Sequence, residues 1–191
     1  MPGTDPSPTP DPGFRLLGSK VLHEGHVIDL HEVRFEAPDG SEMTRDVVRH
    51  PGAVSVVPLF ESGDVVLVRQ FRAPLGREML EIPAGKLDVE GEDLAAAARR
   101  ELAEEVGLAA GNLDHLITFH NSVGFSDEES HVFLATELTE VPRDRQGPEE
   151  LAMVEVRMPL DLAVRAIADG VITDGKTVIG LLAAQARRAA A

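Results

Sequence analysis

Residues 85–108 read GKLDVEGEDLAAAARRELAEEVGL, and this stretch predicts a glycine turn followed by one short helix. Between Glu92 and Val106 the apolar residues recur at every fourth position, so one stripe of a 3.6-residue period can face a core. That stripe consists of Leu94, Ala98, Leu102 and Val106. Gly107 suits the left-handed backbone position that ends a helix. We therefore expect a helix over 92–106 with one buried face.

The neighbouring stripe of the same helix is acidic. Glu101, Glu104 and Glu105 lie three or four residues apart, so their carboxylates project from one side of the helix and repel each other. In one interpretation this is a solvated face whose charges are screened by water. In the other it binds Mg²⁺ or Mn²⁺, which prefer hard oxygen ligands.

The flanking residues favour the metal site. Gly85 follows Pro83 and Ala84 in a turn that can bring a backbone carbonyl close to a cation. Arg100 supplies a counter-charge within the acidic stretch, and Glu92 lies in the first turn, where the helix dipole favours anions. The sequence therefore predicts a divalent-cation site built on this turn and helix.

The stretch resembles the signature of the Nudix hydrolases, in which a glycine and a glutamate precede the run Arg-Glu-apolar-x-Glu-Glu-x-Gly-apolar. The matching residues are Arg100, Glu101, Leu102, Glu104, Glu105, Gly107 and Leu108. Six residues instead of five separate Gly85 from Glu92, and we interpret the extra one as a loop insertion because Glu92 keeps its spacing to Arg100. The resemblance implies an α/β fold with a mixed sheet in an α/β/α sandwich.

Composition and charge limit the function classes. The chain of 191 residues has a net charge of −15 and no cysteine. Clustered Lys and Arg are needed to bind a nucleic-acid backbone, so we expect no nucleic-acid partner. A thiolate zinc site is excluded. The opening residues have no apolar stretch and no run is long enough to span a membrane, so we expect a cytoplasmic protein without a membrane partner.

Pattern and turn residues divide the chain into three parts. Residues 1–13 are rich in Pro, Asp, Ser and Thr and are expected to be disordered. Residues 14–50 are expected to form a small antiparallel β subdomain with three strands. Residues 51–191 are expected to form the Nudix hydrolase domain. In this domain we expect a hairpin of strands 53–59 and 65–69, strands at 113–120, 131–137 and 154–158, and helices at 159–169 and 176–190.

Several segments resemble the ADP-ribose pyrophosphatase branch of the family, over roughly residues 20 to 185. They are VVRHPGAVSVVPL, VRQFRAPLGREMLEIPAGKLD and VGFSDEESHVFLA. This resemblance implies a homodimer that exchanges the N-terminal strands, with each active site built from both chains. A proline that this branch carries before the glycine of the loop is Val123 here, beside Gly124.

The resemblance also assigns roles to single residues. The cations would be held by the Ala84 carbonyl and by Glu101, Glu104 and Glu105, with Glu101 and Glu105 essential for catalysis. A general base should come from a mobile segment, and the loop after Gly124 supplies three carboxylates. The family's spacing selects Glu128, with Glu129 as the alternative.

Substrate recognition needs cations for the phosphates and a surface for the base. Arginine suits the phosphates, because its planar guanidinium matches phosphate oxygens. The resemblance places such a contact at Arg72, and Arg45 from the other chain is the analogous candidate. Glu81 binds metal or a ribose group, or is solvated at a strand end. The chain has no Trp or Tyr, so the base would stack on Phe35 or on His26, or would have no strong stacking partner. His115, His120 and His131 lack metal-ligand spacing and are expected to be structural or solvent-facing.

Together these observations predict an enzyme that uses Mg²⁺ or Mn²⁺ to hydrolyse the pyrophosphate bond of ADP-ribose to AMP and ribose 5-phosphate. The first alternative is hydrolysis of another nucleoside diphosphate sugar, such as a GDP-sugar. The second is a non-catalytic module that senses a nucleotide. The complete set of Glu101, Glu104 and Glu105 counts against the sensor.

Overall fold

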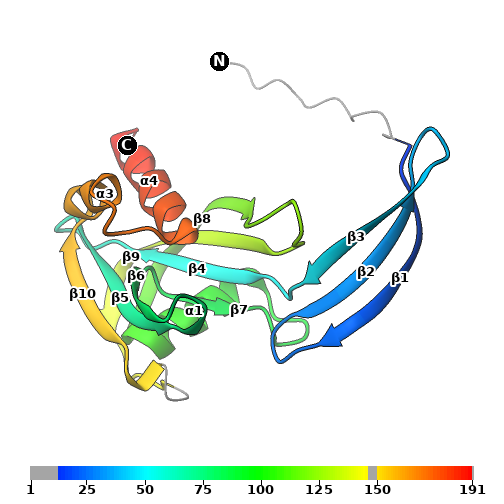
Figure 1. Ribbon diagram of the computed structural model, residues 1–191. Helices are drawn as coiled ribbons and strands as arrows, with labels where there is room; N and C mark the ends of the chain where they lie inside the picture. The colour runs from blue at the N-terminus through cyan, green and yellow to red at the C-terminus, as the bar shows by residue number, and fades with distance from the viewer. Residues whose placement is uncertain (1–12, 146–149, 191) are drawn as a thin grey trace. The chain divides into compact units, whose positions relative to one another are not determined.

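A computed structural model describes residues 13–145 and 150–190 of the chain (Figure 1). The chain divides into two compact units, Met1–His50 with Ser122–Glu128, and Pro51–Asn121 with Glu129–Ala191. The expected disordered tail, residues 1–13, lies outside the described residues except for Gly13.

The first unit is the antiparallel sheet that the sequence predicts. Its strands are β1 (Arg15–Glu24), β2 (Asp29–Glu36) and β3 (Glu42–Arg49), in the order β1-β2-β3. The segment Ser122–Glu128 joins this unit through the backbone of Val48, whose N–H donates to the Phe125 carbonyl (2.7 Å) and whose carbonyl accepts from the Asp127 N–H (3.2 Å). Val33 is the one buried apolar side chain among the described residues of this unit.

The second unit contains two sheets. One has the order β7-β4-β9-β8 and is formed by β7 (Ala84–Lys86), β4 (Ala53–Pro58), β9 (Glu129–Glu140) and β8 (Leu108–His120). Within it β4 runs parallel to β9, and the other pairs are antiparallel. The other has the order β10-β5-β6 and is formed by β10 (Val154–Pro159), β5 (Asp64–Arg72) and β6 (Arg77–Glu81). A short 3₁₀ helix, η1 (Ala73–Leu75), connects β5 to β6.

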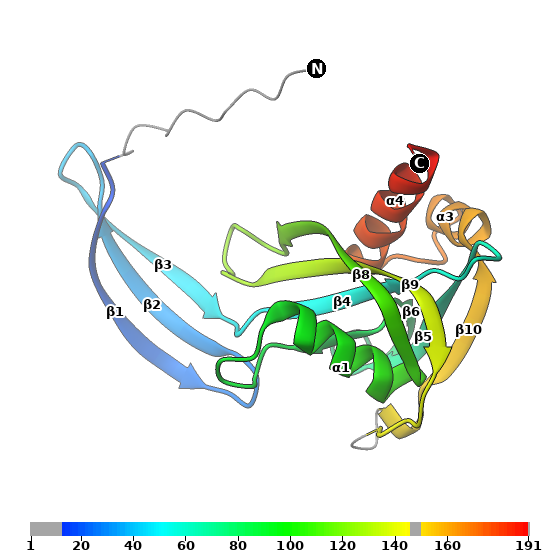
Figure 2. The same cartoon turned by 180° about the vertical axis from the view of Figure 1, so that it is seen from behind.

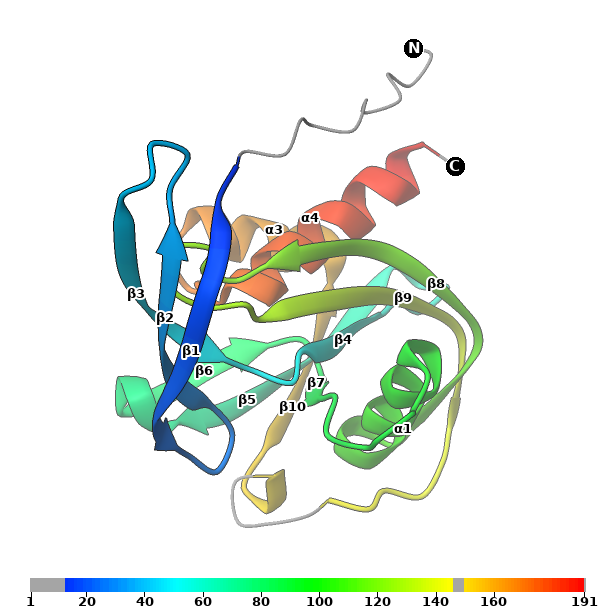
Figure 3. The same ribbon diagram turned by 90° about the vertical axis from the view of Figure 1, so that its right-hand side faces the viewer.

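Among the described residues, three helices cover the sheets of this unit from two sides. They are α1 (Leu94–Val106), α3 (Leu160–Ala168) and α4 (Gly175–Ala189). Val54 and Val56 of β4 pack in the core cluster beneath α1, whereas Val57 packs in the cluster beneath α3 and α4. Figures 2 and 3 show α1 and α4 on opposite sides of β4, β8 and β9. The expected α/β/α sandwich is confirmed. Among the described residues, none of the helices has the length and apolar character needed to cross a membrane.

The expected hairpin of residues 53–69 is wrong. The turn forms, since the Phe60 N–H donates to the Asp64 carbonyl (2.9 Å) and a single bridge joins Leu59 to Val65. Beyond that bridge β4 and β5 enter different sheets. Both edges of β4 are already paired, one with β7 and one with β9, so β5 has no free edge of β4 to pair with.

Two strands are also longer than expected. β8 begins at Leu108, immediately after the residue that ends α1, and β9 extends from Glu129 to Glu140. Ala109 to Gly111 have weak strand propensity, so the sequence places the start of β8 too late. Their long antiparallel pairing with β9 decides the local structure instead.

Candidate active site on helix α1

Helix α1 is fixed at both ends by its own sequence. The Asp93 carboxylate accepts hydrogen bonds from the backbone N–H groups of Ala95 (3.1 Å) and Ala96 (3.3 Å), which caps the first turn. Gly107 has φ 64°, and its N–H donates to the last turn of the helix. The apolar stripe is buried, with Ala98 and Leu102 fully inaccessible. The acidic stripe is therefore held at a fixed rotation about the helix axis.

Two carboxylates of that stripe are buried. Glu101 is 8% exposed and Glu105 is 3% exposed, which is rare for ionised side chains without a partner. Burial raises the pKa of Glu105 to about 8, although the N–H of Ala84 donates to its Oε2 (3.1 Å) and opposes the shift. Burial also raises the pKa of Glu101, against the opposing charge of Arg100. The interpretation as a solvated acidic face does not hold for these two residues.

Arg100 binds three carboxylates of the motif, those of Glu92, Glu101 and Glu104. Its Nε and Nη2 donate to the two oxygens of Glu92, both at 3.0 Å. Its Nη1 donates to Glu101 (2.6 Å) and to Glu104 (3.1 Å). One guanidinium thus compensates three carboxylates, and this explains how the acidic helix tolerates its charge.

The turn before the helix touches both buried carboxylates. A Cβ added to Gly85 would stand 1.9 Å from Cδ of Glu101, so only glycine fits there. The neighbouring Ala84 donates its N–H to Glu105. The loop between Gly85 and Glu92 closes with a turn in which Gly91 has φ 76°. The backbone thereby accommodates six residues while Gly85 and Glu92 both keep their contacts with α1.

This arrangement fits a divalent cation. No three His, Cys, Asp or Glu side chains already converge as a metal cluster within 13–145 and 150–190, because Arg100 draws Glu101 and Glu104 to itself. Glu105 makes no ion pair with the described residues: its Oε2 accepts from the neutral N–H of Ala84, and Arg72 acts on it through its charge alone. A buried carboxyl group of this kind, together with the carboxylate of Glu101 and turn backbone, is a hard-oxygen donor set of the kind that Mg²⁺ and Mn²⁺ take.

Glu81 is not solvated, and this part of the sequence interpretation is wrong. Its side chain is 1% exposed, and its two oxygens accept from Nε (2.7 Å) and Nη2 (2.6 Å) of Arg72. Lys176 also donates to Glu81, and Lys176 in turn contacts Asp174 (3.0 Å). Burial raises the pKa of Glu81, but the bonds and charges of Arg72 and Lys176 outweigh it and the pKa is lowered. Arg72 is thus brought together with Glu81.

The first unit holds the other expected substrate residues. Phe35, Arg45 and Gly124 line one open hollow of about 300 Å³. The remaining lining residues are Asp46, Val47, Val123, Phe125, Ser126 and Asp127. His26 does not line this hollow. It follows Gly25 in the exposed turn between β1 and β2.

The acidic loop, Ser122–Glu128, is held by hydrogen bonds to other residues of the first unit. Asp127 accepts from Nη1 of Arg49 (2.8 Å) and from the N–H of His50 (3.0 Å). Burial raises the pKa of Asp127, but these bonds outweigh it and the pKa is lowered. Glu128 lies 3.9 Å from Nδ1 of His50, and its N–H donates to Oγ of Ser126. Glu129 begins β9 in the second unit, with its carboxylate 3.7 Å from Nε2 of His131.

Sequence reasoning missed two groups of residues. Glu150 lies close enough to the acidic helix that its negative charge raises the pKa values of both Glu101 and Glu105. Lys176 and Asp174 contact the buried network of Glu81. The run Asp-Gly-Lys-Thr before the last helix was an available signal, because Asp174 is an N-cap residue that places Lys176 in the first turn.

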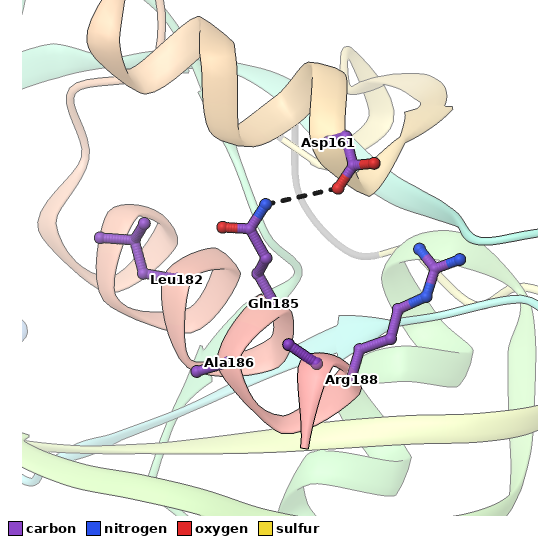
Figure 4. A pocket seen from close by; sticks show the side chains of 6 residues that line it. Asp161, Leu182, Gln185, Ala186 and Arg188 are labelled. Atoms are coloured by element: carbon purple, nitrogen blue, oxygen red, sulfur yellow. Dashed lines mark hydrogen bonds between the residues drawn. The ribbon is translucent and has the colours of Figure 1, made fainter. Parts of the chain in front are cut away.

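Two other features lie apart from this chemistry. His115 and His131 both hydrogen-bond to Oγ1 of Thr118, at 2.8 and 2.9 Å. A hollow between α3 and α4 contains a hydrogen bond from Gln185 to Asp161 (3.3 Å), as Figure 4 shows. Its lining residues are Asp161, Leu182, Gln185, Ala186, Arg188 and Ala189, and none of them is an expected site residue.

Comparison with known proteins gives the family. A model of the NUDIX domain matches residues 49–178. The chain is 37% identical over 175 residues to an ADP-ribose pyrophosphatase of Bacillus subtilis (strain 168), covering 92% of this chain and 94% of that protein. It is 39% identical over 173 residues to an ADP-ribose pyrophosphatase of Mycobacterium tuberculosis (strain ATCC 25618 / H37Rv), covering 91% and 84%.

A solved structure shows the same fold. The crystal structure of an ADP compounds hydrolase superimposes with a TM-score of 0.81 at 21% identity, covering 93% of this chain and 95% of that one. The matched range 49–178 includes the turn and helix that carry Gly85, Arg100, Glu101 and Glu105. The NUDIX model matches more than half of this chain, and two relatives are more than 30% identical to it over most of its length, so this chain belongs to the Nudix family.

Proposed function

We propose that this protein hydrolyses the pyrophosphate bond of ADP-ribose, giving AMP and ribose 5-phosphate, with Mg²⁺ or Mn²⁺ as cofactor. The observation that carries the proposal is the burial of Glu101 and Glu105 against the backbone of Ala84 and Gly85. Both relatives described above act as ADP-ribose pyrophosphatases, and each matches about nine-tenths of this chain.

Four groups would hold the cations: the carbonyl of Ala84 and the carboxylates of Glu101, Glu104 and Glu105. When bound, the cations would neutralise charge on the phosphate oxygens and favour deprotonation of the attacking water. Arg100 already contacts Glu101 and Glu104, so it holds these two carboxylates on one side of α1 and offsets part of their charge. Glu92 in turn fixes Arg100 through two hydrogen bonds.

Phosphate recognition falls to arginine. Arg72 is held in one orientation by the two oxygens of Glu81. Arg45 of the first unit is the second candidate, and it shares a hollow with Phe35 and Gly124. An aromatic ring can stack on a nucleotide base and an arginine can bind its phosphate.

The attacking water needs a carboxylate that takes its proton. Glu128 is the candidate from the resemblance, and Glu129 is its neighbour. Glu150 is the candidate that the structure adds, because its charge acts on both Glu101 and Glu105 within the second unit. We expect Glu150→Gln to lower kcat more than Glu128→Gln or Glu129→Gln, with little change in KM. A larger fall in kcat for Glu128→Gln would return the role to the loop after Gly124.

A homodimer is part of the proposal. The sheet of the first unit has one buried apolar side chain among its described residues, Val33, while Leu16 and Leu22 of β1 are about half exposed. An isolated three-stranded sheet with so little core needs another surface to cover it. Sedimentation should therefore show a dimer, and a fully active monomer would contradict a shared active site.

The function is tested by comparing kcat/KM for ADP-ribose, GDP-mannose and other nucleoside diphosphate sugars in the presence of Mg²⁺ or Mn²⁺. ADP-ribose should rank first, with AMP and ribose 5-phosphate as products. A higher kcat/KM for a GDP-sugar would favour the alternative substrate, which the replacement of the branch's proline by Val123 makes harder to dismiss. If Glu101→Gln turned over substrate as fast as the wild type, the proposed metal site would be excluded. If the wild type turned over none of the substrates, the protein would be a sensor.

A further inference from the structure

The guanidinium of Arg72 makes hydrogen bonds along one of its edges only, within the described residues. Its Nε and Nη2 donate side by side to the two oxygens of Glu81, at 2.7 and 2.6 Å. A guanidinium has five N–H donors, so the two donors of Nη1 and one of Nη2 remain. Those donors have no partner among residues 13–145 and 150–190, and the side chain is 37% exposed. The free edge can therefore bind a phosphate while the other edge stays on Glu81.

Glu81 is shared with a second cation that comes from a distant part of the sequence. Lys176, in the first turn of α4, donates to the same oxygen of Glu81 that accepts from Nη2 of Arg72. The side chain of Lys176 is 14% exposed and that of Glu81 is 1% exposed, so water screens this contact weakly.

The start of α4 holds Lys176 in place. Asp174 caps the helix, accepting from the N–H (3.0 Å) and Oγ1 (2.6 Å) of Thr177, and the same oxygen contacts Lys176 (3.0 Å). Oγ1 of Thr177 in turn accepts from the N–H of Ile82 (2.9 Å), next to Glu81. The first turn of α4 is thus joined both to the side chain of Glu81 and to the backbone beside it.

The charges explain what Lys176 contributes. With Arg72 as its single cation, the buried carboxylate of Glu81 would cancel the charge of the guanidinium that must attract a phosphate. With Lys176 present, two cations share that carboxylate. Asp174 adds a negative charge, but its oxygen also meets the N–H of Thr177 at the positive end of α4.

We propose that Lys176 is a positioning residue for phosphate recognition: it shares the carboxylate of Glu81 with Arg72, so that Arg72 keeps one orientation and leaves its outer donors and positive charge to the substrate. This inference rests on the proposed diphosphate substrate. It adds a residue outside the signature stretch, from a helix that begins about 70 residues after α1 ends.

The test compares Lys176→Met, which keeps the length of the chain without its charge, with Lys176→Arg, which keeps the charge. Arg187→Met on the exposed last turn of the same helix is the matched control. Lys176→Gln, which keeps a donor for Glu81, serves as a second neutral variant if Lys176→Met does not fold. Two quantities are measured: KM and kcat for ADP-ribose, and the Kd of inorganic pyrophosphate by calorimetry in EDTA.

We expect Lys176→Met to raise KM and the Kd of pyrophosphate about tenfold, the size of one hydrogen bond between charged groups, with kcat within about threefold. Lys176→Arg should restore most of the affinity, and Arg187→Met should match the wild type. In an Arg72→Met background, Lys176→Met should have no further effect on Kd, because the role is exerted through Arg72.

Wild-type affinity in both neutral variants, or a wild type that does not bind pyrophosphate, would overturn the inference. So would an equal loss of affinity in Lys176→Met and Lys176→Arg, or additive losses with Arg72→Met, because both would indicate a merely structural role. A wild type that binds pyrophosphate in this Lys176-dependent way but does not hydrolyse ADP-ribose would refute the proposed function and leave the inference standing.

Discussion

The backbone of Gly85 lies directly against the carboxylate of Glu101: a Cβ on this glycine would stand 1.9 Å from Cδ and 2.0 Å from Oε1. The glutamate is 8% exposed and belongs to a helix fixed at both ends, so it cannot move aside without disturbing its neighbours. This contact explains why the signature stretch needs a glycine before its acidic helix.

Gly85→Ala should therefore disrupt the site more than the fold. Forcing a methyl group into a packed contact costs about 1–3 kcal/mol, and the displaced carboxylate should lower kcat by about a hundredfold or more. Gly18→Ala is the control, since its Cβ would meet only Nη2 of Arg34 at 3.8 Å. The measurements are turnover with Mg²⁺ and chemical denaturation. An active Gly85→Ala enzyme would contradict the placement of Glu101.

Arg100 is expected to be irreplaceable by lysine. Its guanidinium binds both oxygens of Glu92 and reaches Glu101 and Glu104 with a third nitrogen, and an ammonium cannot match that fork. Arg100→Lys should lower stability by about 1–3 kcal/mol, because three partly buried carboxylates lose donors. Denaturant unfolding measures this loss. Glu92→Gln, which removes one charge from the same pair, should have a smaller effect, and equal effects would contradict the shared role of Arg100.

Cation binding should depend on pH through Glu105. The pKa of this buried carboxyl is raised from its ordinary value of 4.5 to about 8, so near neutral pH the group is protonated in the metal-free protein. A cation needs the carboxylate and must release that proton, so affinity should rise up to about tenfold per pH unit between pH 6 and 8. Calorimetry with Mn²⁺ in buffers of different ionisation enthalpy measures the proton directly. Equal affinity at both ends of the range would show that Glu105 is already ionised.

Local sequence signals predicted the part of the site that lies in one element. The stop at Gly107 and the spacing from Glu92 to Arg100 are set by residues in or next to the helix. The structure has α1 at Leu94–Val106, two residues later than the expected start at Glu92, because Asp93 is the N-cap residue. Capping residues and helical periodicity act over one or two turns, which is why they can be read without tertiary information.

The remaining parts of the site depend on distant residues. Glu81 can be buried because Arg72 and Lys176 both contact its carboxylate, and Lys176 is 95 positions away in the sequence. Similarly, the separation of β4 from β5 follows from β7 and β9 occupying both edges of β4. Strand pairing and ion pairing between remote segments leave no periodic pattern in either segment, so the expected hairpin and the solvated Glu81 were both wrong.

Glu105→Gln should separate stability from function. The folded protein keeps the proton of Glu105 between pH 4.5 and about 8 and the unfolded chain does not, so the stabilising contribution of this group is complete below 4.5 and is lost as the pH rises towards 8. Glutamine imitates the protonated form at every pH. Without metal at pH 8, Glu105→Gln should therefore have a Tm equal to or above that of the wild type. With Mn²⁺ the wild type should gain stability and the variant should not, and its kcat should fall by about a hundredfold or more. Thermal unfolding with and without Mn²⁺ measures both differences, and a lower Tm for the metal-free variant would mean that the Glu105 carboxylate stabilises the fold in its ionised form.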